Sequence, residues 1–276
     1  MLTILFLGDV VGEPGRSAVM DELPRLKELH AIDFIVVNGE NAAAGRGITP
    51  KITIDLLRAG VSVITTGDHI WDQKEILTFI DTEPRLLRPV NYPDGAPGFG
   101  SIVLETAKGP VGVINVQART FMQPILENPF QALEVAVEKM RAQTSVIFVD
   151  AHGETTSEKI AIGRFLDGKV SAVIGTHTHV QTADEQIFPG GTAFLCDAGM
   201  CGPAHSILGR AIDPIVNRFI SNLPALFPVA RGEVRLCGAV IAIDETTGRA
   251  VQITRVNELI PDLPPEKAAP TADQPS

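Results

Sequence analysis

The stretch SAVIGTHTHVQTAD, residues 171–184, joins a short apolar run to two of the chain's six histidines. The run AVIG is apolar at consecutive positions, which is typical of a strand buried on both faces of an α/β sheet. His177 and His179 follow it, one residue apart. On an extended strand, residues i and i+2 project from the same face, so we expect both imidazoles to point toward one object. A metal, a buried polar network or no partner at all remain open at this point.

Similar apolar, β-branched runs recur along the chain and alternate with segments of helical length. We expect strands within the runs TILFLG, DFIVVNG, VSVITTG, GSIVLE, VGVINV, SVIFVDA, SAVIGT, TAFLCD, EVRLCGAVIAID and AVQITRV. We expect helices at residues 14–29, 49–59, 128–142 and 155–167. The last two strands, separated by ETTG, indicate a hairpin. The pattern predicts a layered α/β fold in one domain, residues 1–260, followed by a flexible Pro-rich tail at 261–276.

The composition argues against several functional classes. The net charge is −10, with 33 acidic against 23 basic residues and no basic cluster, so we expect no stable DNA binding. The three cysteines form no CxxC pair, which fits a reducing compartment. The first apolar run lacks a basic leader, and no run is long enough to span a membrane. We therefore expect a cytoplasmic protein, and leave a homo-oligomer open.

Polar residues with catalytic or metal-binding potential follow six of the apolar runs. In open α/β sheets, ligand sites form just beyond the carboxyl ends of the strands, so these residues are expected to converge. Each alone has a plainer interpretation as a turn or helix cap, and for Asp197 a capping role and an orienting role stay equally open. Their coincidence at six strand ends favours a site. The residues are Asp9, Glu40, Asn41, Asp68, His69, His152, His177, His179 and Asp197.

Seven of these residues form a candidate metal-ligand set. One metal rarely takes seven mixed oxygen and imidazole ligands, whereas two metals bridged by a carboxylate use them comfortably. Nitrogen and oxygen donors without thiolate suit manganese, iron, zinc, cobalt or nickel better than calcium or magnesium. Among these we expect iron or manganese, with zinc possible. His177 and His179 would then each bind a different metal. The seven are Asp9, Glu40, Asn41, Asp68, His152, His177 and His179.

Six longer motifs give a family resemblance. The segments GDVVGEPGR, NGENAAAGRGI, GDHIWD, HGETTSEK, GTHTHVQTAD and DAGMCGP resemble the motif series of the calcineurin-like metallophosphoesterases. More narrowly, they are similar to the bacterial subfamily related to YmdB-type 2′,3′-cyclic nucleotide phosphodiesterases. The resemblance runs from residue 4 to about residue 255. It implies a four-layer α/β/β/α sandwich with mixed sheets and a dinuclear site at the sheet edge.

The resemblance also implies a role for each ligand. Asp9, Glu40, Asn41 and His179 would hold the first metal, and Glu40, Asp68, His152 and His177 the second, with Glu40 bridging. His69 would stand beside the substrate as general acid. The chain departs from the family at one position, because Asp68 occupies the place where the motif normally has asparagine. This substitution adds one negative charge to the site.

The chemistry indicated is hydrolysis of small phosphodiesters, with 2′,3′-cyclic nucleotides as the expected substrates. A hydroxide held by the metals would attack phosphorus, and His69 would protonate the leaving oxygen. Phosphomonoesters and phosphoproteins present the same phosphorus, so a phosphomonoesterase or phosphoprotein phosphatase stays open. A metal-binding regulatory scaffold with little catalysis is a third alternative, which an intact His69 argues against. An amidohydrolase is disfavoured, because its HxH motif usually lies on the first strand.

Overall fold

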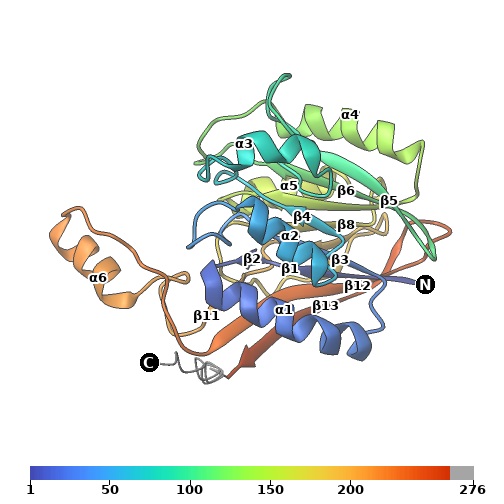
Figure 1. The fold of residues 1–276 in the computed structure, drawn as a ribbon. Helices are drawn as coiled ribbons and strands as arrows, with labels where there is room; N and C mark the ends of the chain where they lie inside the picture. The colour runs from blue at the N-terminus through green and yellow to red at the C-terminus, as the bar shows by residue number, and fades with distance from the viewer. Residues whose placement is uncertain (262–276) are drawn as a thin grey trace, which may run out of the picture.

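The computed structural model of the chain describes residues 1–261, so the predicted tail at 261–276 lies outside the described residues apart from its first residue (Figure 1). Ten strands correspond to the ten predicted runs: β1 (Leu2–Leu7), β3 (Phe34–Asn38), β4 (Val63–Thr65), β5 (Ser101–Thr106), β6 (Gly109–Gln117), β7 (Val146–His152), β8 (Ala172–Thr176), β10 (Ala193–Leu195), β12 (Val234–Ile243) and β13 (Ala250–Ile260). Three short strands were not predicted: β2 (Asp9–Val10), β9 (Gln186–Ile187) and β11 (Met200–Pro203).

Four helices lie where the sequence predicts them, within two residues at each end: α1 (Gly12–Leu29), α2 (Pro50–Arg58), α4 (Pro129–Arg141) and α5 (Thr156–Phe165). The short α3 (Ile76–Phe79), the 3₁₀ turn η1 (Ile80–Thr82) and α6 (Ile212–Ser221) were not predicted. Both α2 and α4 begin with a residue whose side chain accepts from the first turn, Thr49 and Asn128, followed by proline. These are the start signals that a helix N-terminus favours.

The strands form two mixed sheets. The first has seven strands in the order β2-β11-β12-β1-β3-β4, with β13 pairing β12. The second has six strands in the order β5-β6-β7-β8-β10-β9. Strands β1, β3 and β4 run parallel in the first sheet, and β6, β7 and β8 run parallel in the second. The predicted hairpin of β12 and β13 is confirmed by their antiparallel pairing.

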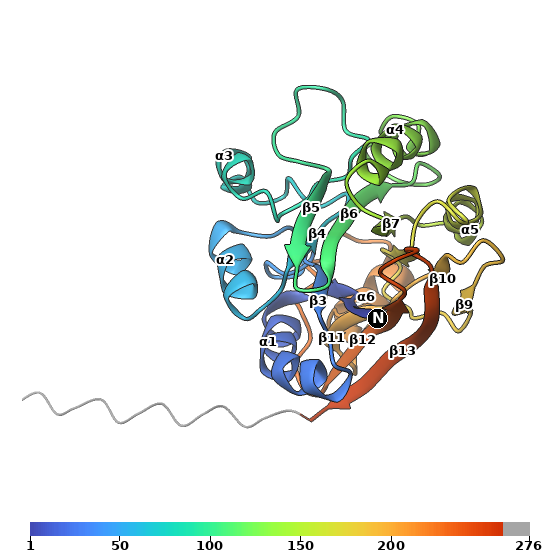
Figure 2. The same ribbon diagram turned by 90° about the vertical axis from the view of Figure 1, so that its right-hand side faces the viewer.

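Four layers result, as predicted. Figure 2 shows α1 and α2 on one outer face and α4 and α5 on the other, with the two sheets between them. Three apolar cores separate the layers, one under each helix pair and one between the sheets. Phe6 of β1 and Phe148 of β7 meet in the middle core, with ring centroids 5.0 Å apart. The doubly apolar strand runs are thus explained by burial on both faces.

The remaining expectations about bulk properties have simple outcomes. The three cysteines, Cys196, Cys201 and Cys237, are buried free thiols, as expected of core residues. The first apolar run is the core strand β1, in which Leu2, Ile4 and Phe6 are fully buried. Within residues 1–261, no helix combines the length and apolar character needed to cross a bilayer.

Candidate metal centre

Eight of the nine polar residues predicted to converge lie at the carboxyl ends of parallel strands from both sheets. Asp9 follows β1, the Glu40–Asn41 pair follows β3 and the Asp68–His69 pair follows β4. From the second sheet, His152 ends β7, and His177 and His179 follow β8. The site therefore sits where the two sheets meet, at one edge of the middle core. The structure brings the whole predicted set together.

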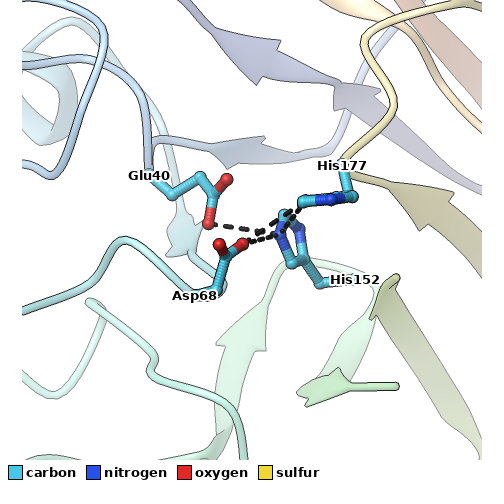
Figure 3. A group of neighbouring side chains, drawn as sticks. All are labelled: Glu40, Asp68, His152 and His177. Atoms are coloured by element: carbon cyan, nitrogen blue, oxygen red, sulfur yellow. Dashed lines mark hydrogen bonds and ion pairs between the residues drawn. The ribbon is translucent and has the colours of Figure 1, made fainter. Parts of the chain in front are cut away.

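One group of donors gathers around His152 (Figure 3). His152 Nε2 lies 2.9 Å from Asp68 Oδ1, 3.3 Å from Glu40 Oε2 and 3.1 Å from His177 Nδ1. One potential ligand atom from each of these four residues lies within 4.8 Å of all the others. Figure 3 shows the two carboxylates on one side and the two imidazoles on the other, all aimed at a common centre. Such convergence of mixed oxygen and nitrogen donors is what a transition metal requires.

A second group adjoins the first through the other oxygen of Glu40. Asn41 Nδ2 lies 3.0 Å from Glu40 Oε1 and 3.2 Å from His179 Nε2. His179 Nε2 in turn lies 3.9 Å from Asp9 Oδ1. The two oxygens of Glu40 thus face different groups of donors. A carboxylate in this position can serve both groups at once.

The electrostatics of the site demand positive charge. Burial raises the pKa of Glu40 well above its usual range, and the nearby carboxylates of Asp68 and Asp9 raise it further. Burial also acts to raise the pKa of Asp68, but hydrogen bonds from His152 and His177 outweigh it and leave that pKa lowered. Three carboxylates so close together are stable only when protons or cations compensate them.

Two observations indicate that a cation fits here better than protons alone. Asp9 Oδ1 is buried and has no hydrogen-bond partner, which is costly unless another group neutralises it. His152 Nδ1 lies 2.9 Å from Thr176 Oγ1, whose proton is directed at Asp150 Oδ1, 2.7 Å away. In this arrangement Thr176 can accept from His152 Nδ1, and Nε2 of the neutral ring can then serve as the ligand atom beside the carboxylates of Asp68 and Glu40. Two carboxylates and a neutral imidazole nitrogen that converge on one point can bind a divalent metal ion, which offsets the negative charge of the carboxylates.

The two histidines of the HxH motif do not lie on a strand, which corrects the expectation drawn from their spacing. β8 ends at Thr176, and His177 and His179 have φ angles of 103° and 65°. Left-handed backbone is unfavourable for residues with a Cβ and persists where surrounding contacts enforce it. The turn directs His177 to the His152 group and His179 to the Asn41 group, so the pair serves both sides of the site.

A buried ion pair holds this strained turn. Asp197 Oδ2 accepts hydrogen bonds from Thr178 N at 3.2 Å and Thr178 Oγ1 at 2.8 Å, and Asp197 Oδ1 accepts from Gly199 N at 2.9 Å. Lys159 Nζ lies 2.7 Å from the same Oδ2, and both charged side chains are 1% exposed. Thr178 stands between the two histidines. Asp197 therefore has the orienting role that the sequence left open. It acts indirectly, because it holds Thr178, the residue between His177 and His179.

Below the donors, the middle core ends in a polar network that sequence reasoning missed. Asp150 accepts hydrogen bonds from Asn38 Nδ2 at 3.0 Å and Thr176 Oγ1 at 2.7 Å, and from Thr65 Oγ1. Burial raises the pKa of Asp150 to about 7, against the effect of these three hydrogen bonds. Asp150 precedes His152 by two residues, so both project from the same face of β7, and this spacing was the available signal.

His69 lies beside the donors and has its own partners. His69 Nδ1 is 3.1 Å from Asp72 Oδ2, which also pairs with Arg46 Nε at 2.9 Å. Its Nε2 lies 3.8 Å from Asp68 Oδ2. Burial lowers the pKa of His69, Arg46 lowers it further, and Asp68 opposes both. The contact from Asp72 leaves Nε2 of His69 directed at the site. Asp72 and Arg46 were not among the predicted residues.

Comparisons with known proteins agree with this geometry. The family model described as YmdB-like protein matches residues 5–256. The 2′,3′-cyclic-nucleotide 2′-phosphodiesterase of Bacillus subtilis (strain 168) is 48% identical over 255 residues, which cover 92% of this chain and 96% of that protein. Among solved structures, a phosphatase from Mycoplasma pneumoniae superimposes with a TM-score of 0.89 at 33% identity, covering 95% of this chain and 94% of its own.

A second solved structure, a hypothetical protein from Thermus thermophilus, has a TM-score of 0.88 at 38% identity, and covers 94% of this chain and 100% of its own. Both structural relatives thus share the fold over nearly their full lengths. The family match, the sequence identity and the shared fold all extend across the strands that carry the site. The chain belongs to the YmdB-like protein family.

Proposed function

We propose that residues 1–260 act as one domain that hydrolyses 2′,3′-cyclic nucleotides with the aid of two transition-metal ions. The observation that carries the proposal is the double convergence at Glu40. One of its oxygens faces His152 and the other faces Asn41. The name of the Bacillus subtilis relative supports the substrate class and points to the ester at O2′ as the bond that breaks.

Two ligand sets follow from this arrangement. Glu40, Asp68, His152 and His177 would hold one ion. Asp9, Glu40, Asn41 and His179 would hold the other. We expect iron or manganese at both places, with zinc possible, because mixed carboxylate and imidazole donors bind all three metals. Such ions, when bound, would supply the positive charge that offsets phosphoryl oxygens and acidifies the attacking water.

A side chain of the protein supplies the proton that the leaving group needs. The leaving O2′ needs a proton as its bond to phosphorus breaks, because an alkoxide is a poor leaving group. His69 holds Nδ1 against Asp72 and presents Nε2 to the site. We infer that the His69 imidazolium donates its Nε2 proton to that oxygen while Asp72 keeps the ring oriented. Water adds to phosphorus, and the product is a nucleoside 3′-phosphate.

The test is hydrolysis of 2′,3′-cyclic AMP in the presence of Mn²⁺, with and without chelator, followed by chromatography of the products. We expect adenosine 3′-monophosphate to form only when metal is present. The His69→Ala variant should keep its metal content and lose about 10²–10⁴-fold in kcat. His205→Ala is the matched control, because His205 is an exposed histidine outside the cluster.

The same experiment separates the alternatives. Turnover of p-nitrophenyl phosphate without any turnover of the cyclic nucleotide would favour a phosphomonoesterase. Metal binding without turnover of either substrate would favour a regulatory scaffold. Loss of metal from His69→Ala would make His69 a ligand and remove the general-acid assignment.

A further inference from the structure

α6 and the segments that flank it form an arm beside the metal centre. Figure 1 shows α6 set apart from the two-sheet body, at the end of two connecting segments. Arg210 fastens the base of this arm, because its guanidinium donates to the carbonyl oxygens of Ala44, Gly45 and Phe227. The Leu208 carbonyl lies 3.1 Å from His179 Nδ1. The arm is therefore tied directly to a proposed metal ligand.

One face of α6 looks onto the metal centre. Ile215, Arg218 and Phe219 of α6 are spaced i, i+3 and i+4, which places them on a single helix face, and Asn222 caps the end of the helix. All four line a pocket of about 620 Å³ that also reaches Glu40, Asn41, His69, His177 and His179. This volume lies within the roughly 300–1,000 Å³ typical of small-molecule sites. The donors form one end of the pocket and the arm forms the other.

The arm end of the pocket is apolar and aromatic. Phe219 and Phe227 line it together with Ile207, Leu208 and Ile215. Phe219 is 84% exposed, so its ring packs against little of the protein itself. Two arginines also line this end: Arg210 is engaged by three carbonyl groups, and Arg218 donates to Asn222 Oδ1 at 2.8 Å. The wall therefore suits a flat, largely apolar group better than a second phosphate.

We propose that this wall binds the base of the substrate, stacked on Phe219, while the phosphate lies at the metal centre. The inference rests on the proposed function and deepens it, because it names nucleoside phosphoesters as the substrate class. Small diesters without a base would contact the metal centre but not the arm wall. Continuity of the arm wall with the donors supports this occupant. Because every base has a π face, the pocket accepts purines and pyrimidines alike.

The test compares two diesters, 2′,3′-cyclic AMP and methyl p-nitrophenyl phosphate, at saturating Mn²⁺. The variants are Phe219→Ala and the control Leu226→Ala, which alters an arm residue that is 90% exposed and does not line the pocket. Loss of a base–aromatic stack weakens binding by about 5- to 150-fold. We therefore expect Phe219→Ala to raise KM for the cyclic nucleotide by about tenfold or more with kcat little changed. We expect methyl p-nitrophenyl phosphate kinetics within about twofold of the unaltered protein.

Calorimetric titration with adenosine 3′-monophosphate gives a readout apart from turnover, and we expect the same loss of affinity in Phe219→Ala only. Equal effects on both diesters, or an unchanged KM for the nucleotide, would overturn the inference. A change from oligomer to monomer in both arm variants, seen by sedimentation velocity, would also overturn it and make the arm a subunit interface. Failure of the unaltered protein to hydrolyse either diester would instead overturn the proposed function.

Discussion

Breaking the buried pair of Lys159 and Asp197 should destabilise the protein more than any exposed charge change. In Asp197→Asn, the amide can present only one oxygen, so its NH₂ group faces either Gly199 N or the donors of Thr178. Lys159 Nζ then loses its charged partner and keeps at most a neutral amide oxygen and Thr176 O, at 3.4 Å, as acceptors. Removal of one partner from a buried ion pair costs about 3–5 kcal/mol, against a typical total stability of about 5–15 kcal/mol.

The assay is urea unfolding with chelator present, so that metal binding does not contribute. We expect Asp197→Asn and Lys159→Met each to lower the free energy of unfolding by about 3–5 kcal/mol. The double variant should lose clearly less free energy of unfolding than the two single variants lose together, because it leaves no buried charge unpaired. Lys139→Met, an exposed lysine, should stay within about 0.5 kcal/mol of the unaltered protein.

The pair should also affect the site, because Asp197 holds Thr178 between two histidines in left-handed conformation. We expect Asp197→Asn to bind Mn²⁺ more weakly even at temperatures where it is fully folded. A cost below about 1 kcal/mol for Lys159→Met, or strictly additive effects in the double variant, would refute the reasoning.

Three further predictions concern the carboxylates. Glu40→Gln should lower the metal-to-protein ratio more than His179→Ala, measured by elemental analysis, because both donor groups share Glu40; two tightly bound equivalents in Glu40→Gln would contradict this. Asp68→Asn should remain active, bind inorganic phosphate more tightly and move the acidic limb of the pH–rate profile to lower pH, because the site becomes more positive by one charge. Weaker inhibition by phosphate in this variant would count against the charge argument. With chelator present, the free energy of unfolding of Asp150→Asn should rise relative to that of the unaltered protein between about pH 4 and about pH 7, by up to roughly 4 kcal/mol. The reason is that the folded protein retains a proton on Asp150 that the unfolded chain gives up in this pH range. A stability difference independent of pH would show that Asp150 is not protonated in the folded protein.

The order of strands and helices was largely predictable, because runs buried on both faces are apolar at consecutive positions. α6 escaped prediction for a physical reason. It carries proline at its third position. Only Ile215 of α6 is buried, so no apolar stripe faces a core.

The convergence of site residues followed from the rule that parallel strands present their carboxyl ends at one edge. The details did not follow, because they depend on tertiary contacts. The turn at His177 and His179 is held by Asp197, which lies on another segment, and the spacing of the motif alone favoured a strand. Lys159 gave no signal, since a lysine in a helix is ordinarily exposed.

The position of β12 in the first sheet has a consequence for how the site forms. β12 lies between β11 and β1, and its pairing joins Leu2 to Ile243. During synthesis, β1 leaves the ribosome before β12, one of its two sheet neighbours, has been made. Closing so long a loop is slow and entropically costly. Asp9, which opens β2 one residue beyond β1, therefore reaches its final position only after β12 has emerged. A nascent fragment that already contains every proposed ligand still lacks the strand that pairs with β1 beside the first of them.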